Sequence, residues 1–286
     1  MRIAFATCRT MPDGHPDDHA ALAALGATYA VWDDPSVNWH RYDRVVVRSV
    51  WDYTTKRAEF VAWAGSVGPE RLRNTPALIA FNSDKTYLGD LAAATVPTTF
   101  VRPGDASPAL DGEVVVKPNI SAGARDTGRF GPATHDLAAQ LITRITASGR
   151  TALVQPYLPD VDANGEIGLV HFNGALSHVL RKRAVLRPDE VAPVAADDGV
   201  APAAVMLEDD LVVLGEADAE QLAFAAEVIA ELTARFGTLP LYARVDVARD
   251  GDGRPVLMEV EAIEPMLYLR ISPGAAARFT AAVLAS

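Results

Sequence analysis

Charged side chains that could bind a metal ion alternate with apolar residues in two neighbouring segments of the sequence. In YARVDV at 242–247, the alternation would place Arg244 and Asp246 on one face of a β-strand. A turn-like RDGDGRP follows, and the next segment, VLMEVEAIEP, would place Glu259 and Glu261 together on one face of a second strand. Two such strands, paired side by side, would gather three carboxylates and an arginine.

Carboxylates crowded in this way repel one another unless a cation neutralises them, and an all-oxygen cluster is the ligand set that Mg²⁺ or Mn²⁺ prefers. The same alternation would turn Met258 and Val260 to the opposite face. An exposed hairpin with charged outer faces is the competing interpretation. A hydrolase could also use Glu259 and Glu261 as paired carboxylates, but that interpretation leaves the basic residues described next unexplained.

A lysine followed by a glycine-rich loop provides groups that bind phosphate. The segment EVVVKP is typical of a strand, and Lys117 lies at its end. The following loop, NISAGARDTGRFGP, contains small residues that let backbone N–H groups approach an anion closely: Ser121, Gly123, Gly128 and Gly131. Gly123 and Gly128 have the Walker A spacing, but Arg129-Phe130 occupy the positions of the required Lys-Ser/Thr, so a P-loop is excluded. A long flexible surface loop is the alternative.

Further basic residues stand at two other places. Lys85 lies in the expected first turn of a helix that begins at Ser83-Asp84, where a cation opposes the helix dipole. This hints at an anionic ligand, with a solvated lysine as the alternative. The segment GEIGLVHFNGALSHVLRKRAVLRP is typical of a hairpin that turns at Asn173-Gly174. Its second strand carries basic residues that form either a solvated face or a phosphate clamp: Arg181, Lys182, Arg183 and Arg187.

A polar and aromatic cluster, RSVWDY, directly follows the third expected strand. Ligands in parallel α/β sheets bind beyond the carboxyl ends of the strands, so Arg48, Trp51 and Asp52 are candidate substrate contacts. The alternative is that Trp51 and Tyr53 simply cover the hydrophobic core.

Short apolar strands alternate with helices in the first part of the chain, which indicates a parallel α/β sheet. No G-x-G-x-x-G follows the first strand, so a dinucleotide site is not supported there. In the first part we expect strands at 2–7, 28–33 and 43–49, helices at 19–26 and 55–64, and a linker at 69–76. Beyond it we expect a helix after Ser83, helices at 134–149 and 218–237, and an irregular connection at 189–218.

Composition limits the class of protein. With 286 residues the chain is long enough for two or three small domains, and 49% hydrophobic with 22% charged residues describes an ordinary globular protein. The net charge of −11 argues against a nucleic-acid partner, though not against a nucleotide. Cys8 is the single cysteine, so a reducing cytoplasm is expected, and Cys8 is either a packed small residue or a thiol nucleophile. The sequence contains no apolar run of about 18 residues, so we expect no membrane span.

Taken together, these motifs resemble the ATP-grasp ligase superfamily of glutathione synthetase, ribosomal-protein glutamate ligase and D-alanine:D-alanine ligase. The resemblance covers nearly the whole chain and depends on the order of N-x-D-K at 82–85, V-P-T-T at 96–99, the EVVVKP strand with its loop, Q-P-Y-L at 155–158, R-x-D at 244–246 and E-x-E at 259–261. It implies an α/β (α+β) fold with an N-terminal parallel-sheet domain at 1–80 and two ATP-grasp subdomains at 81–157 and 158–286. Related folds also suggest a homodimer.

The resemblance implies a role for each matching residue. Lys85 and Lys117 would contact the phosphates of ATP, and the loop at 121–131 would close over them. Adenine would be held by Gln155, Pro156, Tyr157 and Leu158. The ribose would be bound by Glu166 or, less favourably, by Asp160 or Asp162, and the γ-phosphate by Lys182 or Arg183. Two Mg²⁺ ions would be bound by Asp246, Glu259 and Glu261. Many relatives have asparagine at position 261, so a glutamate there leaves the preferred ion less certain.

Within the superfamily, ATCRTMPDG, RSVWDY, SAGARDTGRFGP and EVEAIEP are similar to the cycloserine-forming cyclo-ligases. That likeness implies activation of the carboxylate of O-ureido-D-serine as an acylphosphate, attack by a nitrogen of the same molecule, and stabilisation of the oxyanion by Arg244. Besides the RSVWDY residues, the organic substrate would meet Glu264, Tyr268 and Arg270. An intermolecular amide ligase and a noncatalytic nucleotide-binding module are the alternatives.

Overall fold

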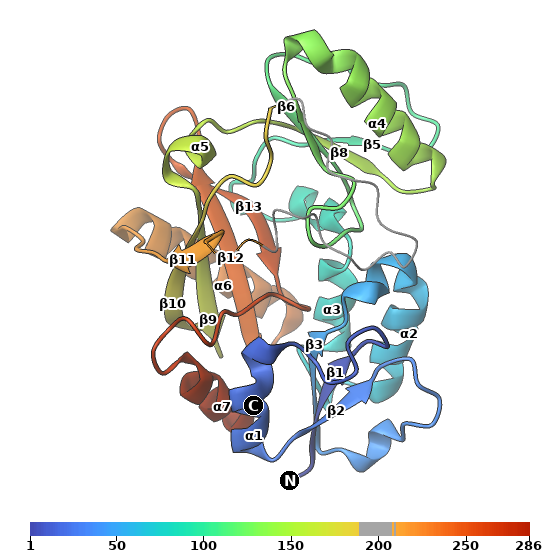
Figure 1. Cartoon of the computed structure of the whole chain (residues 1–286), viewed down its shortest axis with the longest axis vertical. Helices are drawn as coiled ribbons and strands as arrows, with labels where there is room; N and C mark the ends of the chain where they lie inside the picture. Colours follow the sequence, from blue (N-terminus) through green and yellow to red (C-terminus); the bar gives the residue numbers. More distant parts are fainter. Residues whose placement is uncertain (189–207, 209) are drawn as a thin grey trace.

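The computed structural model describes residues 1–188, 208 and 210–286, which form three β-sheets arranged around a cleft (Figure 1). The predicted mixed α/β fold with one parallel sheet is confirmed. Each sheet lies within one of the three expected segments, 1–80, 81–157 and 158–286. None of the described helices combines the length and apolar character needed to cross a membrane.

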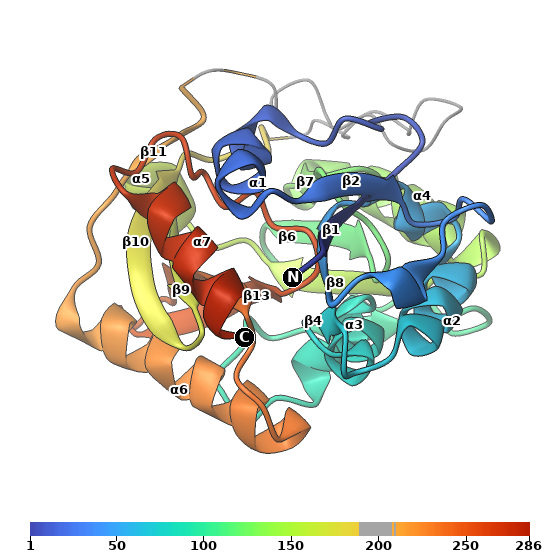
Figure 2. The same ribbon diagram turned by 90° about the horizontal axis from the view of Figure 1, so that it is seen from below.

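The N-terminal sheet is parallel, with the order β2-β1-β3-β4. Alternate residues of its strands pack on opposite faces, because successive side chains of a strand point to opposite sides. Ala4 and Val45 face α2, whereas Phe5 and Val46 face α1 and α7. Figure 2 shows α1 and α7 next to each other on one side of this sheet, to the left of its strands. The elements are β1 (Ile3–Thr7), α1 (His19–Leu25), β2 (Thr28–Val31), β3 (Arg44–Ser49), α2 (Arg57–Val67), β4 (Leu72–Arg73) and α7 (Ala275–Ala285), with 3₁₀ turns at Pro16–Asp18, Trp39–Arg41 and Trp51–Thr55.

The central sheet is antiparallel, with the order β5-β8-β6-β7, and α4 packs on it through Leu141 and Ile145. Its strands are β5 (Thr99–Val101), β6 (Val114–Pro118), β7 (Gly128–Phe130) and β8 (Ala152–Pro156), with a 3₁₀ turn at Pro132–Thr134 before α4 (His135–Ala147). The expectation of an irregular loop through Gly131 is wrong at its end, because residues 128–130 pair with 114–116 as β7.

The C-terminal sheet is antiparallel, with the order β11-β10-β9-β12-β13, and α6 covers one face. The predicted hairpin is confirmed, since Asn173 and Gly174 have φ angles of 45° and 79°. Asp218 begins α6 with a capping box. The elements are α5 (Asp160–Asn164), β9 (Glu166–Phe172), β10 (Ala175–Lys182), β11 (Val212–Leu214), α6 (Ala219–Phe236), β12 (Tyr242–Arg249) and β13 (Pro255–Glu261). Most of the expected connection at 189–218 lies outside the described residues, but Val212–Leu214 within it forms a strand.

The segment between the N-terminal and central sheets differs from the expected linker and helix. It forms α3 (Pro76–Asn82), whose first turn is capped by Thr75, and a 3₁₀ turn (Lys85–Gly89) capped by Asp84. Asn82 fixes it against β13, because its side chain donates to the Val260 carbonyl at 2.7 Å and accepts from the Ala262 N–H at 2.8 Å. This segment therefore delivers Lys85 to the edge of the C-terminal sheet.

Candidate active site

A cleft of about 690 Å³ lies between the central and C-terminal sheets, and the N-terminal domain borders one side of it. Its floor is the pair of strands β12 and β13. Here Arg244 lies opposite Glu261 and Asp246 opposite Glu259. Asp246, Glu259 and Glu261 each offer one oxygen atom, and these three atoms lie within 4.8 Å of one another. The structure thus brings together the carboxylates that the sequence placed on two neighbouring strands.

A β-bulge shapes this floor. Asp246 pairs with Glu259, but the next residue, Val247, pairs with Leu257, so Met258 is an extra residue in β13. Met258 consequently lines the cleft beside Glu259. The expectation that Met258 turns away from the carboxylates is therefore wrong, because strict alternation is interrupted at the bulge.

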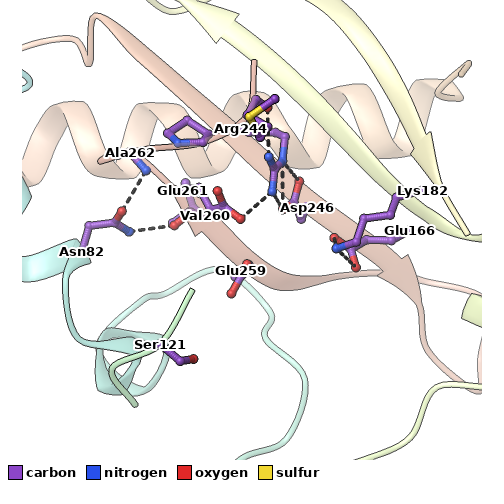
Figure 3. A network of polar contacts seen from close by, with 12 residues as sticks. Asn82, Ser121, Glu166, Lys182, Arg244, Asp246, Glu259, Val260, Glu261 and Ala262 are labelled. Carbon is purple, nitrogen blue, oxygen red and sulfur yellow. Dashed lines mark hydrogen bonds and ion pairs between the residues drawn. The ribbon is translucent and has the colours of Figure 1, made fainter. Parts of the chain in front are cut away.

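Arg244 holds the acidic floor in place. Its Nε donates to Asp246 at 2.7 Å, its Nη2 donates to Asp246 at 2.7 Å and to Glu261 at 2.5 Å, and its Nη1 donates to the Met266 carbonyl at 3.0 Å (Figure 3). These bonds use the Nε hydrogen, both Nη2 hydrogens and one Nη1 hydrogen. One Nη1–H is left without an acceptor among the described residues.

The protonation of the three carboxylates reflects their crowding. Burial raises the pKa of Asp246 to about 6 and that of Glu261 well above its usual range, in both cases against the opposing charge of Arg244. Burial acts in the same direction on Glu259, but Lys85 and Lys117 lower the pKa of this carboxyl below its usual range. An all-oxygen set of crowded, buried carboxyl groups fits a divalent cation such as Mg²⁺ or Mn²⁺, because the cation would neutralise their negative charge.

Two lysines on different structural elements approach the floor. Lys85 donates to the carbonyl of Ser121 at 2.8 Å, and its Nζ lies 3.6 Å from Glu259. Lys117, on β6, has no hydrogen bond or ion pair to its ammonium group among the described residues. Burial lowers the pKa of Lys117, although Glu259 acts in the opposite direction. A partly buried ammonium group without a protein partner provides a site for an anion.

The basic residues of β10 separate into two environments. Lys182 points to the floor and lies 3.3 Å from Glu166 (Figure 3). Burial acts to lower the pKa of Lys182, but Glu166 and Asp246 raise it above its usual value, so Lys182 is a cation. Arg183 borders the cleft but is engaged by Glu208 and by Asp210 in a solvent-exposed cluster. The placement favours Lys182 of the two alternatives for a phosphate contact.

The glycine-rich loop lines the cleft through residues 121–124 and Thr127. Ser121 and Gly123 line the cleft, and Ser121 faces Glu259 across it (Figure 3). Gly128 does not line it, and the expected role in binding is corrected: Gly128 begins β7, where an added Cβ would lie 2.6 Å from the ring of Phe130. Its small size serves packing.

The strand β8 ends at the mouth of the cleft with the four residues expected to hold adenine, which all line it: Gln155, Pro156, Tyr157 and Leu158. Glu166 lines it as well, whereas the alternatives for the ribose are engaged elsewhere. Asp160 accepts from the Arg249 N–H at 3.0 Å, and Asp162 accepts from Arg129 at 2.9 Å. The geometry leaves Glu166 as the carboxylate that faces the cleft at this end.

The residues expected to meet the organic substrate separate into two groups. Trp51, Glu264 and Tyr268 line the cleft, together with Tyr53. Burial raises the pKa of Glu264 to about 7 despite the nearby Lys85, and the Tyr53 hydroxyl interacts with this carboxyl group. The predicted cluster at the end of β3 therefore does border the cleft, but through its aromatic residues.

Arg48, Asp52 and Arg270 do not line the cleft, and their expected substrate contacts are corrected. Arg48 is buried, forms an ion pair with Asp18 at 3.0 Å and donates to the Pro265 carbonyl at 3.1 Å. Asp52 accepts from the indole of Trp32 at 2.8 Å and pairs with Lys56. Arg270 is exposed. Arg48 and Asp52 thus connect structural elements, because their side chains point towards neighbouring segments of the chain.

Sequence reasoning missed some residues that line the cleft: Thr10, Met11, His15, Met258 and Met266. Thr10, Met11 and His15 belong to the loop after β1, which leaves the same edge of the parallel sheet as the RSVWDY cluster. That position was the available signal. Cys8, at the start of this loop, is fully buried and reduced, in agreement with its interpretation as a packed residue.

The three sheets and the arrangement of lysines opposite carboxylates define the class of protein as an ATP-grasp ligase. The fold is shared by the D-alanine–D-alanine ligase of Bacillus anthracis in complex with ATP, with a TM-score of 0.61 at 15% identity over 100% of this chain and 95% of that one. At this level of identity the likeness shows the fold alone.

Closer relatives define the family. Residues 3–74 match the model of the N-terminal domain of D-cycloserine synthetase DcsG. The crystal structure of D-cycloserine synthetase DcsG has a TM-score of 0.82 at 31% identity and covers 99% of this chain and 98% of that one. The cycloserine biosynthesis protein DcsG of Streptomyces lavendulae is 35% identical, over 92% of this chain and 90% of its own length. The chain belongs to the D-cycloserine synthetase family of ATP-grasp ligases, which confirms the resemblance found in the sequence.

Proposed function

We propose that this chain is an ATP-dependent cyclo-ligase that converts O-ureido-D-serine to D-cycloserine. The observation that carries the proposal is the cleft itself. In a member of this family, it gathers an unpartnered Lys117, the loop at 121–124 and the carboxylates of Asp246, Glu259 and Glu261. Cations and backbone N–H groups on one wall and carboxylates on the other suit a phosphate chain bridged by metal ions.

Each wall of the cleft has residues suited to hold ATP and its metal ions. Asp246, Glu259 and Glu261 would hold Mg²⁺, or Mn²⁺, which when bound neutralises the charge on the transferred phosphoryl group. Lys85 and Lys117 would bind the phosphates under the loop at 121–124. Lys182 would reach the γ-phosphate from the opposite wall, while Glu166 and the four residues at 155–158 would hold the nucleoside.

The chemistry begins with attack of a substrate carboxylate oxygen on the γ-phosphorus, which breaks the bond to ADP and forms an acylphosphate. The ureido nitrogen that is bonded to oxygen then attacks the acyl carbon, loses its proton and expels phosphate, so that the five-membered ring closes. Water removes the carbamoyl group as CO₂ and ammonia. Arg244 contributes its remaining Nη1–H to the oxyanion at the acyl carbon, because Asp246 and Glu261 already fix the guanidinium in position.

The remaining cleft residues suit the other end of an amino acid. Glu264 and the Tyr53 hydroxyl offer a site for the α-ammonium group, and Trp51 and Tyr268 form apolar walls that exclude water from a folded-back substrate. Ring closure within one molecule needs orientation more than an additional catalytic group, which fits a cleft whose walls are rigid aromatic residues.

The decisive experiment uses O-ureido-D-serine labelled with ¹⁸O in its carboxylate, together with ATP and Mg²⁺. We expect D-cycloserine, ADP and phosphate that carries one labelled oxygen. Unlabelled phosphate would exclude the acylphosphate route. Turnover that requires a separate amine would identify an intermolecular ligase, turnover without ATP a hydrolase, and ATP binding without turnover of any carboxylate a noncatalytic module.

The expected surroundings of the enzyme follow from the same activity. A reaction that consumes ATP, in a chain whose single cysteine is free and buried, fits the cytoplasm. The net charge of −11 disfavours nucleic-acid partners, and the organic partner is a small amino-acid carboxylate. A homodimer stays a prediction, which sedimentation of the purified protein would test.

A further inference from the structure

The loop between β1 and the first 3₁₀ turn holds a histidine at the edge of the cleft. The loop is fixed by several bonds: the Thr7 hydroxyl donates to the Met11 carbonyl at 2.5 Å, and the Gly14 N–H donates to the same carbonyl at 2.9 Å. Gly14 has a φ of 63°, and a Cβ there would lie 2.1 Å from the ring of Tyr29, so the turn before His15 requires glycine. The backbone position of His15 is therefore well defined.

Three further contacts hold His15, two of them through its ring. Its Nδ1 accepts a hydrogen bond from the Asp17 N–H at 3.2 Å, and its backbone N–H donates to the Ser49 hydroxyl at 3.0 Å. The ring also packs edge to face against Trp51, with centroids 5.9 Å apart. His15 and Trp51 both line the cleft, so the free part of the imidazole borders the space assigned to the organic substrate.

The hydrogen bond at Nδ1 determines the tautomer. A backbone N–H can only donate, so Nδ1 must carry a lone pair, and in a neutral imidazole the proton then resides on Nε2. Burial lowers the pKa of the His15 imidazole. Asp17 and Asp18 act to raise it, and Arg48 and Arg270 act to lower it further. The ring is accordingly neutral near pH 7, with Nε2–H as a donor that has no acceptor among the described residues.

We propose that His15 is a substrate-binding residue whose Nε2–H donates a hydrogen bond to the carbamoyl oxygen of the ureido group. This inference rests on the proposed function. The charged ends of the substrate have charged partners in the cleft, since Arg244 and the lysines suit the carboxylate and Glu264 suits the ammonium group. The uncharged carbamoyl oxygen is the acceptor left for a neutral donor.

This contact fixes the end of the substrate that must fold back for ring closure. Binding the carbamoyl oxygen next to Trp51 restricts rotation of the ureido group and leaves its ring-forming nitrogen free to face the acyl carbon. Because Nε2 already carries a proton, His15 cannot accept one from that nitrogen. The structure thus assigns His15 to orientation and not to proton abstraction.

Two substitutions separate the donor from the capping role of the side chain. Asparagine keeps an oxygen at the place of Nδ1, so His15→Asn preserves the bond to Asp17 and removes the donor. Glutamine places an amide N–H close to the position of Nε2, so His15→Gln keeps the donor and loses the cap. We expect His15→Asn to raise KM for O-ureido-D-serine by about 3- to 10-fold, as for the loss of one neutral hydrogen bond, and to leave KM for ATP unchanged. His15→Gln should remain within about 3-fold of the wild type.

Binding of the product provides the matching control, because D-cycloserine lacks the carbamoyl group. We expect His15→Asn to leave the Kd of D-cycloserine, measured by calorimetry, within about 2-fold of the wild type. A wild-type KM in His15→Asn, or a loss in His15→Gln that is as large as that in His15→Asn, would overturn the assignment. If the wild-type enzyme fails to turn over O-ureido-D-serine, the proposed function itself is refuted. Normal turnover with an unaffected His15→Asn refutes this inference alone.

Discussion

Lys117 and Lys85 should respond differently to the same substitution, because one has protein partners and the other has none. We expect Lys117→Met to lower kcat/KM by about 10²- to 10³-fold, since an ammonium group aimed at the transferred phosphoryl group stabilises charge in the transition state. Lys85→Met should cause a loss of activity of similar size. The two variants should then differ in stability.

The difference in stability follows from the contacts of each ammonium group. Lys85 donates to the Ser121 carbonyl at 2.8 Å and lies 3.6 Å from Glu259, so its removal leaves an acceptor and a carboxylate without their cation. A hydrogen bond from a charged group contributes about 1.5–3 kcal/mol, and the partial exposure of Lys85 favours the lower value. Lys117 makes no such bond, and burial lowers its pKa, so methionine there relieves a desolvation cost.

Thermal unfolding without nucleotide measures this difference. With about 1.5 kcal/mol lost, Tm of Lys85→Met should fall by about 3–6 °C, because about 1 kcal/mol corresponds to roughly 2–4 °C in a chain of this size. Tm of Lys117→Met should stay within about 1 °C of the wild type or rise. An equal fall in both variants would refute the conclusion that Lys117 is held ready for an anion. A wild-type kcat/KM in Lys117→Met would refute its contact with phosphate.

Two other substitutions test the remaining assignments. Arg48→Met removes one partner of a buried ion pair with Asp18, which typically costs about 3–5 kcal/mol. Tm should therefore fall by about 6 °C or more, while KM of the folded enzyme is maintained. A raised KM at unchanged Tm would restore Arg48 as a substrate contact. Burial raises the pKa of Glu264 to about 7, so the native state retains a proton that the unfolded chain releases near pH 4.5, and wild-type stability falls as pH rises between these values. Glu264→Gln should lose less stability over that range in urea denaturation, and parallel pH profiles of the two proteins would contradict the raised pKa.

The sequence predicted the carboxylate floor because alternation along a strand fixes which side chains share a face. Arg244, Asp246, Glu259 and Glu261 lie together for that reason. The bulge at Met258 could not be predicted, since no residue in VLMEVE marks it and it depends on the pairing with β12. Local periodicity therefore predicted the charged residues of the floor, but it did not predict that Met258 would lie beside them.

The polar residues beyond β3 show where such reasoning ends. The end of a parallel strand correctly indicated the edge that borders the cleft, yet it did not tell which side chains turn inward. Trp51 borders the cleft, whereas Arg48 turns towards Asp18 and Asp52 towards Trp32. These partners lie far away in the sequence, so the choice depends on tertiary packing. The place of His15 likewise depends on a distant residue, Trp51, in addition to the nearby Asp17.

The distribution of buried contacts also explains how such a cleft can serve two substrates. The N-terminal and C-terminal sheets share one hydrophobic core, in which Phe5 and Val46 pack with Phe172 and Phe279. Buried hydrogen bonds reinforce this junction, such as those from Tyr242 Oη to the carbonyls of Val47 and Ile263. The residues proposed to bind the organic substrate thus lie on two parts of the chain that share one core.

The central sheet has a core of its own within residues 101–154, and its residues Leu153 and Phe100 also join the core of the C-terminal sheet. Polar contacts also link it to the rest of the molecule, including those from Lys85 to Ser121 and from Arg125 to Thr54 at 2.6 Å. Polar contacts break and re-form at lower cost than apolar packing, so we expect the loop at 121–124, which Lys85 contacts at the Ser121 carbonyl, to move more readily than the sheets when ATP binds. The organic substrate can therefore keep its folded-back conformation against His15 and Glu264 while Lys117 and the loop at 121–124 close over the phosphates. In this proposal, one part of the chain orients the substrate for ring closure and another part delivers the phosphoryl group.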